Sequence, residues 1–100
     1  MHKFLVISKD STEDGLPCHY CNASVQRLEF LGYEFEEQKL KKDERIELYD
    51  RLGLMGDDRR VPQNFIQTDD GPLERIGGYK ALCLYLDEHG LNVVQHEAHS

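Results

Sequence analysis

The feature that most constrains the fold is a continuous apolar run at residues 3–8 (Lys-Phe-Leu-Val-Ile-Ser). Apolar and polar residues do not alternate within it, which is typical of a strand that is buried on both faces. Such strands occur in sheets that are covered by helices, so the run predicts an α/β domain. The run is also far too short to span a membrane or to form the core of a signal peptide.

Further along the chain, apolar spacing and turn residues predict three helices and three more strands. Apolar residues spaced by three or four positions indicate the helices, and short runs bounded by turn residues indicate the strands. The polar segment Lys9–Pro17 is predicted to be a loop, as are residues 54–61, and Asp43 is a suitable N-cap for the second helix. The predicted elements are strands at 3–8, 33–36, 64–68 and 73–76, and helices at 18–31, 43–53 and 79–90.

This order, β-α-β-α-β-β-α, limits the topology to few choices. The first two strands are joined through a helix, so we expect them to be parallel with a right-handed crossover. The last two strands form a hairpin and add antiparallel neighbours. The prediction is a four-stranded mixed sheet with helices on both faces, in one domain at residues 1–90. Residues 91–100 are predicted to be a loosely held C-terminal tail.

The charge balance and the cysteine count limit the classes of function. The chain has 12 Lys and Arg against 19 Asp and Glu, a formal net charge of −7. A domain this acidic repels a phosphate backbone, which argues against nucleic-acid binding through a basic patch. Its 3 cysteines are too few for a secreted framework of several disulfides. We therefore expect a soluble, cytoplasmic protein that binds neither nucleic acid nor membrane.

Cys18 and Cys21 carry the strongest chemical signal. They follow the first buried strand, they open a predicted helix, and Pro17 stands directly before them. A free thiol with a pKa of about 8.5 is only about 3% thiolate at pH 7, whereas cysteines in such positions reach pKa values of roughly 3.5–7.5. Cys18, at the exposed helix start, is the expected nucleophile. Cys21, one turn further in on the apolar face, is the expected resolving thiol of a dithiol–disulfide exchange.

A zinc site is the main alternative interpretation of the pair. Structural zinc requires four ligands, and no second closely spaced pair of ligands follows in the chain. Cys83 lies on an apolar helix face and is expected to be a small core residue. The histidines are scattered, and the last two lie in the predicted tail: His2, His19, His89, His96 and His99. We therefore expect no metal.

Three segments in this order resemble a known family. They are Pro17-Cys18-His19-Tyr20-Cys21, Arg59-Arg60-Val61-Pro62-Gln63-Asn64-Phe65-Ile66 and Ile76-Gly77-Gly78-Tyr79. They resemble the glutaredoxins of the thioredoxin fold, most of all the small dithiol glutaredoxins of bacteria and their phages. The likeness covers residues 3 to 89, nearly the whole chain.

The resemblance implies roles for specific residues. Pro62 looks like the cis-proline that faces the active cysteines, where the Val61 main chain pairs with a bound peptide as a short strand would. From the residues alone, Pro62 could equally be a trans proline at the start of a strand. The resemblance also implies that Gly77-Gly78 holds the γ-glutamyl carboxylate of glutathione and that Arg59 faces its glycine carboxylate. The implied glutathione- and substrate-binding residues are Tyr20, Arg59, Val61, Pro62, Gly77, Gly78 and Tyr79.

The sequence departs from the family pattern at three places. His19 stands where relatives often have proline, and its charge varies around neutral pH, so it is expected to modulate the site. Lys80 stands where many relatives have an aspartate that contacts the amino group of glutathione. The loop at residues 9–16 is long, which leaves Lys9 as the candidate for the lysine that usually precedes the cysteines.

The resemblance implies a glutathione-dependent thiol–disulfide oxidoreductase that reduces protein disulfides and glutathione mixed disulfides. Glutathione would be the reducing co-substrate, ribonucleotide reductase one electron acceptor, and the protein a monomer. One alternative is a redoxin that a thioredoxin reductase reduces, which Lys80 and the long loop motivate. A second is an iron–sulfur carrier in which two chains bridge a cluster through Cys18 and glutathione, which His19 keeps open.

Overall fold

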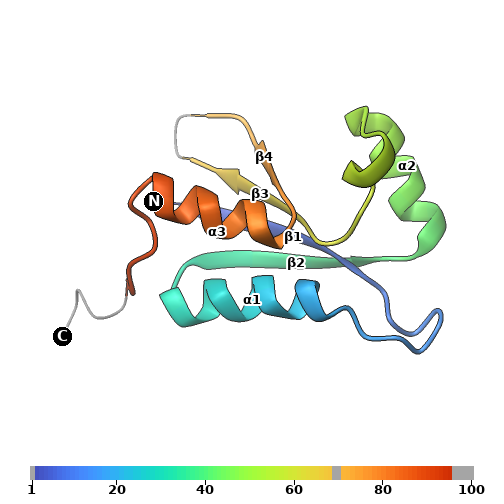
Figure 1. The fold of residues 1–100 in the computed structure, drawn as a ribbon, viewed down its shortest axis with the longest axis horizontal. Coiled ribbons are helices and arrows are strands. Elements are labelled where there is room, and N and C mark those ends of the chain that lie inside the picture. The colour runs from blue at the N-terminus through green and yellow to red at the C-terminus, as the bar shows by residue number, and fades with distance from the viewer. Residues whose placement is uncertain (1, 69–70, 96–100) are drawn as a thin grey trace.

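The computed structural model of the chain describes residues 2–68 and 71–95 (Figure 1). The elements follow the predicted order, with one short 3-10 turn added before the third strand. They are β1 (Lys3–Lys9), α1 (His19–Leu31), β2 (Glu34–Leu40), α2 (Lys42–Leu52), the turn at Gly56–Asp58, β3 (Gln63–Gln67), β4 (Glu74–Gly77) and α3 (Tyr79–Glu88).

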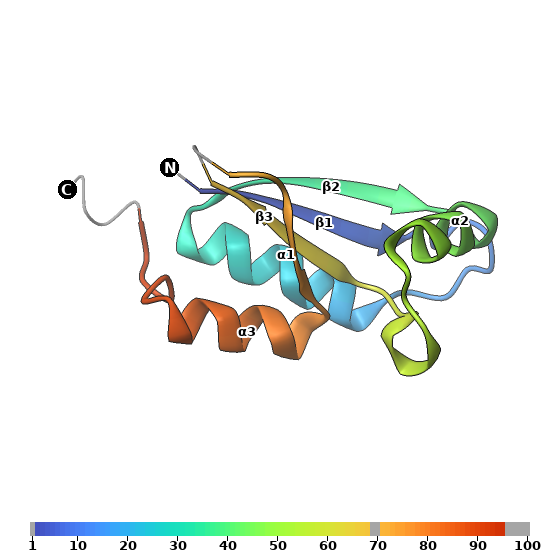
Figure 2. The same ribbon diagram turned by 90° about the horizontal axis from the view of Figure 1, so that it is seen from above.

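The four strands form one mixed sheet in the order β2-β1-β3-β4. β1 and β2 are parallel and joined through α1, whereas β1–β3 and β3–β4 are antiparallel. α1 and α3 lie together on one face of this sheet, and α2 stands apart from them, at the end of the sheet where β1 and β2 finish (Figures 1 and 2). The predicted mixed sheet and element order are therefore confirmed.

The apolar run that predicted β1 supplies the centre of the core. Phe4 and Val6 are buried and pack with leucines of α1 and α3. Fully burying a side chain of this size stabilises the fold by roughly 1.5–3 kcal/mol. On the opposite face of β1, Ile7 is also buried, whereas Leu5 is only half-buried. β1 is thus covered on both faces along part of its length, as a run without alternation requires.

Most element boundaries differ from the sequence prediction by one or two residues, and contacts from elsewhere in the chain explain two of the differences. β2 extends to Leu40 because it pairs with β1 along its whole length, up to Lys9 opposite Leu40. α2 begins at Lys42, so the prediction of Asp43 as its N-cap was wrong. The side chain of Glu44 accepts from the Lys41 amide at 2.9 Å, and Glu13 of the long loop accepts from the Lys42 amide at 3.0 Å. Because these two carboxylates accept hydrogen bonds from the first amides of α2, the helix starts before Asp43.

Part of the predicted tail is attached to the domain. The Tyr33 hydroxyl donates to the Leu91 carbonyl at 2.7 Å, and the main-chain N–H of Gln95 donates to the Leu31 carbonyl at 2.6 Å. Leu91 and Val94 pack against the core. Residues 96–100, which include His96 and His99, lie outside the described residues. Within the described residues, no helix has the length and apolar character needed to cross a membrane.

Candidate redox site

Cys18 and Cys21 form a disulfide at the start of α1, with their Cα atoms 5.2 Å apart. Cys18 is the N-cap residue and has extended backbone, whereas Cys21 lies in the first turn of the helix. Their exposure differs sharply, since Cys18 is half-buried and Cys21 is only 2% exposed. Solvent or a partner therefore reaches the Cys18 sulfur more readily than the Cys21 sulfur.

The surroundings of Cys18 favour a negative charge on its sulfur. The main-chain amide of Cys21 donates a hydrogen bond to the Cys18 sulfur at 3.2 Å. The positive end of the α1 dipole lies at the same place, and no acidic residue occupies the first turn of the helix. His19, the next residue, has an exposed side chain. Both the amide and the dipole lower the energy of a thiolate relative to a thiol.

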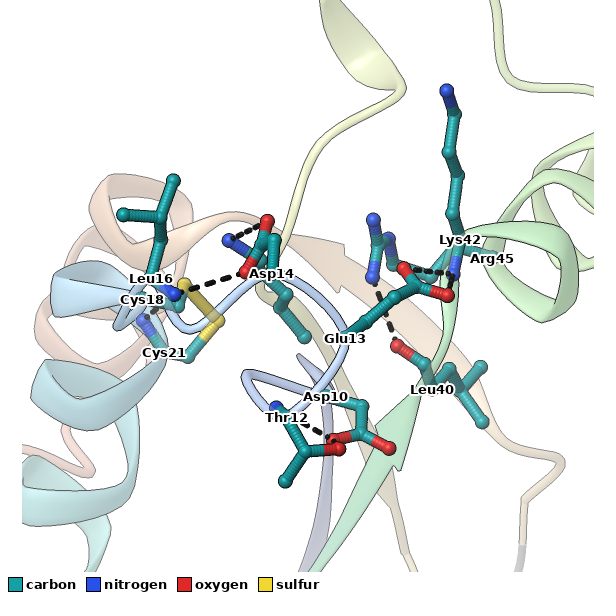
Figure 3. Close-up of polar contacts among 11 residues, drawn as sticks. Asp10, Thr12, Glu13, Asp14, Leu16, Cys18, Cys21, Leu40, Lys42 and Arg45 are labelled. Atoms are coloured by element: carbon teal, nitrogen blue, oxygen red, sulfur yellow. Dashed lines mark hydrogen bonds and ion pairs between the residues drawn. A yellow bond between two sulfur atoms is a disulfide. The ribbon is translucent and has the colours of Figure 1, made fainter.

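The long loop before Cys18 is fixed by its own polar contacts (Figure 3). Lys9 forms an ion pair with Asp14 at 2.7 Å, and Asp14 also accepts from the Leu16 amide at 3.0 Å. These two contacts hold the pKa of the Asp14 carboxyl below its ordinary value, the bond from Lys9 being the larger cause. Lys9 is thus engaged with Asp14, and the structure does not bring it to the Cys18 sulfur as a free cation.

A pocket of about 520 Å³ lies between the first turn of α1, the segment before β3 and the start of α3. Tyr20 and Tyr79 form part of its wall, with ring centroids 6.2 Å apart and planes inclined at 31°. The Val61–Pro62 peptide bond is cis, as the resemblance implied, and both residues line the pocket. Within the described residues, the Val61 amide and carbonyl have no hydrogen-bond partner. A bound segment could pair with them.

Gly77 and Gly78 close one side of this pocket. Gly78 is the N-cap of α3, and a Cβ atom there would lie 3.6 Å from Cδ of Arg60 and 3.9 Å from the Pro62 carbonyl oxygen. Gly77 has φ of 126°, and a Cβ atom there would lie 3.0 Å from the Cβ of Ala81. Gly77 therefore needs to be glycine, because of its positive φ and the contact with Ala81, whereas Gly78 lies at ordinary contact distance from the cis-proline segment.

Of the predicted binding residues, Arg59 is the one that the structure places elsewhere. Its guanidinium donates to the Leu54 carbonyl at 2.7 Å and pairs with Asp50 of α2. It does not line the pocket. The neighbouring Arg60 does, and its Nε donates to the Asp57 carbonyl. The other predicted binding residues all line the pocket: Tyr20, Val61, Pro62, Gly77, Gly78 and Tyr79.

Sequence reasoning missed a second arginine in this pocket, Arg75 of β4. Its Nε donates at 2.8 Å to the side-chain oxygen of Gln63. Gln63 is fully buried, and its amide nitrogen donates to the carbonyls of Asp58 at 2.9 Å and Arg60 at 2.8 Å. One buried amide thus fixes both a pocket arginine and the loop before the cis-proline. The sequence held no local signal for Arg75, because its place in the pocket depends on Gln63 of the neighbouring strand.

Asn64 provides a second buried polar link, between α1 and the pocket. Its side-chain nitrogen donates to the Ser24 hydroxyl at 3.3 Å and to the Gly77 carbonyl at 3.1 Å, and its oxygen has no partner in the described structure. Cys83, on α3, is a free thiol and is half-buried. Within residues 2–68 and 71–95, no group of three or more His, Cys, Asp or Glu side chains is arranged to hold a metal ion.

Comparison with known proteins gives a likeness among solved structures. No protein-family profile and no curated protein matches the sequence. Among solved structures, the chain is similar to glutaredoxin 1 from Francisella tularensis, determined as a complex with cacodylate, with a TM-score of 0.65 and 26% sequence identity. The match covers 89% of this chain and 96% of that one. The chain therefore has the thioredoxin-like fold of a glutaredoxin, with a mixed sheet and a CxxC-spaced disulfide.

Proposed function

We propose that this protein is a glutathione-linked thiol–disulfide oxidoreductase. The observation that carries the proposal is the position of the disulfide. A half-exposed N-cap sulfur is bonded to a buried sulfur one turn away, and Tyr20, which stands between the two cysteines, lines a pocket that carries a cis-proline and an unpaired main-chain segment. This arrangement offers an accessible nucleophile, a shielded second thiol and a surface that can hold the substrate.

The reaction follows from the difference in exposure. In the reduced protein the Cys18 thiolate attacks one sulfur of the substrate disulfide, and the other substrate sulfur leaves as a thiolate that takes up a proton. Cys21 then loses its proton, attacks the Cys18 sulfur and releases the second substrate thiol. The Cys18–Cys21 disulfide is left behind, and two molecules of glutathione reduce it while forming one molecule of glutathione disulfide.

The pocket supplies groups that match the parts of glutathione. In the proposed complex the main-chain amides at the start of α3, after Gly78, bind the γ-glutamyl carboxylate. Arg60, which lines the pocket where Arg59 does not, binds the glycine carboxylate in this complex. The Val61 main chain pairs with the cysteine residue of glutathione, as in the addition of a short strand. Tyr20 and Tyr79 cover its apolar parts.

Lys80 favours a second candidate, in which a thioredoxin reductase supplies the electrons. Its side chain lines the pocket, where it would repel the ammonium group of glutathione. The test measures NADPH oxidation with a disulfide substrate, once with glutathione and glutathione reductase and once with thioredoxin reductase. We expect turnover in the glutathione system, with the Cys18→Ser variant as the inactive control. Turnover only with thioredoxin reductase would reject the glutathione assignment and keep the exchange chemistry.

A further inference from the structure

The pocket lined by Tyr20, between the two cysteines in sequence, is cationic although the protein as a whole is acidic. Its lining carries Arg60, Arg75 and Lys80 against a single carboxylate, Asp58, so the local balance is 3 − 1 = +2. The whole chain has a net charge of −7. A local reversal of sign of this kind selects ligands of opposite charge.

The two arginines are held by neutral groups and not by carboxylates. Arg75 donates to the amide oxygen of Gln63, and Arg60 donates to the Asp57 main-chain carbonyl. Neither forms an ion pair with a carboxylate in the described part of the chain, whereas their neighbour Arg59 pairs with Asp50. A guanidinium held through one nitrogen by a neutral acceptor is oriented, and its remaining N–H groups are available to a carboxylate.

The carboxylates on the other side of Cys18 are engaged within the fold. Asp14 pairs with Lys9, Glu13 accepts from the Lys42 amide, and Asp10 accepts from Thr12. Of these three, only Asp14 is neutralised by a cation, so the positive balance is a property of the pocket lining, where Asp58 is the single carboxylate. Glutathione matches it only in part, since its two carboxylates are accompanied by an ammonium group, which Arg75 and Lys80 repel.

We propose that the protein substrates of this site carry their disulfide in an acidic segment. The proposal rests on the proposed exchange function and adds the substrate class to it. An extended segment that pairs with the Val61 main chain would pass through the pocket, and its Asp or Glu side chains near the reacting cysteine would meet the pocket cations. The preference is electrostatic, so it weakens as salt shortens the Debye length from about 30 Å at 0.01 M to about 3 Å at 1 M.

The test is a single-turnover reduction of three disulfide-bridged peptides of equal length by the reduced protein. The residues that flank the two cysteines are Glu in one peptide, Gln in the second and Lys in the third. No glutathione is present, so the rates report the first exchange and not the recycling. At low salt we expect the Glu peptide to react about fivefold faster than the Gln peptide, the Lys peptide to react slowest, and high salt to remove the difference.

Charge variants then locate the effect. Arg75→Gln and Lys80→Gln should each lower the Glu-to-Gln rate ratio. Arg51→Gln is the matched control, because it makes the same change in net charge on α2, where the Arg51 side chain is 69% exposed. Equal rates for the three peptides, or an equal loss of preference in the Arg51 variant, would overturn the inference. Failure to reduce any of the three peptides would instead overturn the proposed exchange function.

Discussion

The main-chain amide of Cys21 donates a hydrogen bond to the Cys18 sulfur at 3.2 Å. This donor belongs to the backbone of α1, so reduction of the disulfide leaves it in place. A two-unit fall in a thiol pKa corresponds to about 2.7 kcal/mol. A hydrogen bond to a charged group contributes roughly 1.5–3 kcal/mol and the helix dipole roughly 0.3–1 kcal/mol. Both contributions act in the same direction and favour the thiolate of Cys18 in the reduced protein.

The first prediction concerns the reactivity of Cys18 in the reduced protein. The rate of its alkylation by iodoacetamide should rise with pH with a midpoint below the ordinary value of about 8.5 for a free thiol. Cys21 should react far more slowly at every pH because it is buried. Peptide mass spectrometry separates the three cysteines, and Cys83 serves as the internal reference. A Cys18 midpoint at 8.5 would contradict the assignment of the thiolate.

The second prediction separates the roles of the two cysteines. Cys18→Ser should abolish exchange with every substrate, because a hydroxyl is neither acidic nor nucleophilic enough. Cys21→Ser should still reduce glutathione mixed disulfides, which need only the first thiol, and should lose the dithiol route on protein disulfides. The measurement is turnover of a glutathionylated peptide beside that of a protein disulfide. Equal loss in both variants would show that the division of roles is wrong.

The sequence predicted those parts of the fold that local patterns determine. The apolar run became β1, and the residues that follow Pro17 open α1 at the cysteines. The cis bond at Pro62 came from the family resemblance, since the residues alone also allow the trans form. The extent of β2 and the start of α2 could not be read locally, because pairing with β1 and the distant carboxylate of Glu13 decide them.

Contacts with distant residues also explain why Arg60 lines the pocket and Arg59 does not. Both are loop arginines with the same chemistry, adjacent in sequence. Asp50 of α2 pairs with Arg59 and draws it away from the pocket, which leaves Arg60 beside Gly78. Arg75 carried no local signal either, because its place in the pocket depends on Gln63, twelve residues earlier.

The third prediction follows from this exchange of arginines. Arg60→Gln should raise the KM for a glutathione mixed disulfide about two- to fivefold, which corresponds to the roughly 0.5–1 kcal/mol of an exposed ion pair. Arg59→Gln should leave that KM unchanged and lower the unfolding midpoint, because it removes the contacts with Leu54 and Asp50. Steady-state kinetics and urea unfolding of both variants test this. A larger rise in KM for Arg59→Gln would restore the role that the family resemblance implied.

The fourth prediction concerns the buried link between α1 and the pocket. Asn64→Ala should lower the free energy of unfolding by about 2–3 kcal/mol, because it leaves the Gly77 carbonyl without its donor and opens a cavity. Ser24→Ala should cost only about 0.5 kcal/mol, since it removes a bond of 3.3 Å and Asn64 retains its bond to Gly77. Urea unfolding measures both. Similar losses in the two variants would show that the contact with Gly77 is not the important one.

The fifth prediction uses the ion pair that fixes the loop before Cys18. The pKa of Asp14 is lowered from 3.8 in the folded protein, first by the hydrogen bond with Lys9 and then by that with the Leu16 amide. The folded state therefore binds the proton of Asp14 less readily than the unfolded state. The resulting stabilisation is fully present above pH 3.8 and is lost as the pH falls through the folded pKa.

Asp14→Asn should consequently lower the melting temperature at about pH 6. The gap between wild type and variant should close toward the lowest pH at which both still unfold cooperatively, because the protonated carboxyl of Asp14 and the amide that replaces it are both uncharged. High salt at about pH 6 should narrow the gap as well, since the side chain of Asp14 is exposed to solvent. A gap that keeps its size at low pH would mean that the packing of the loop, and not the charge of Asp14, holds the segment before Cys18 in place.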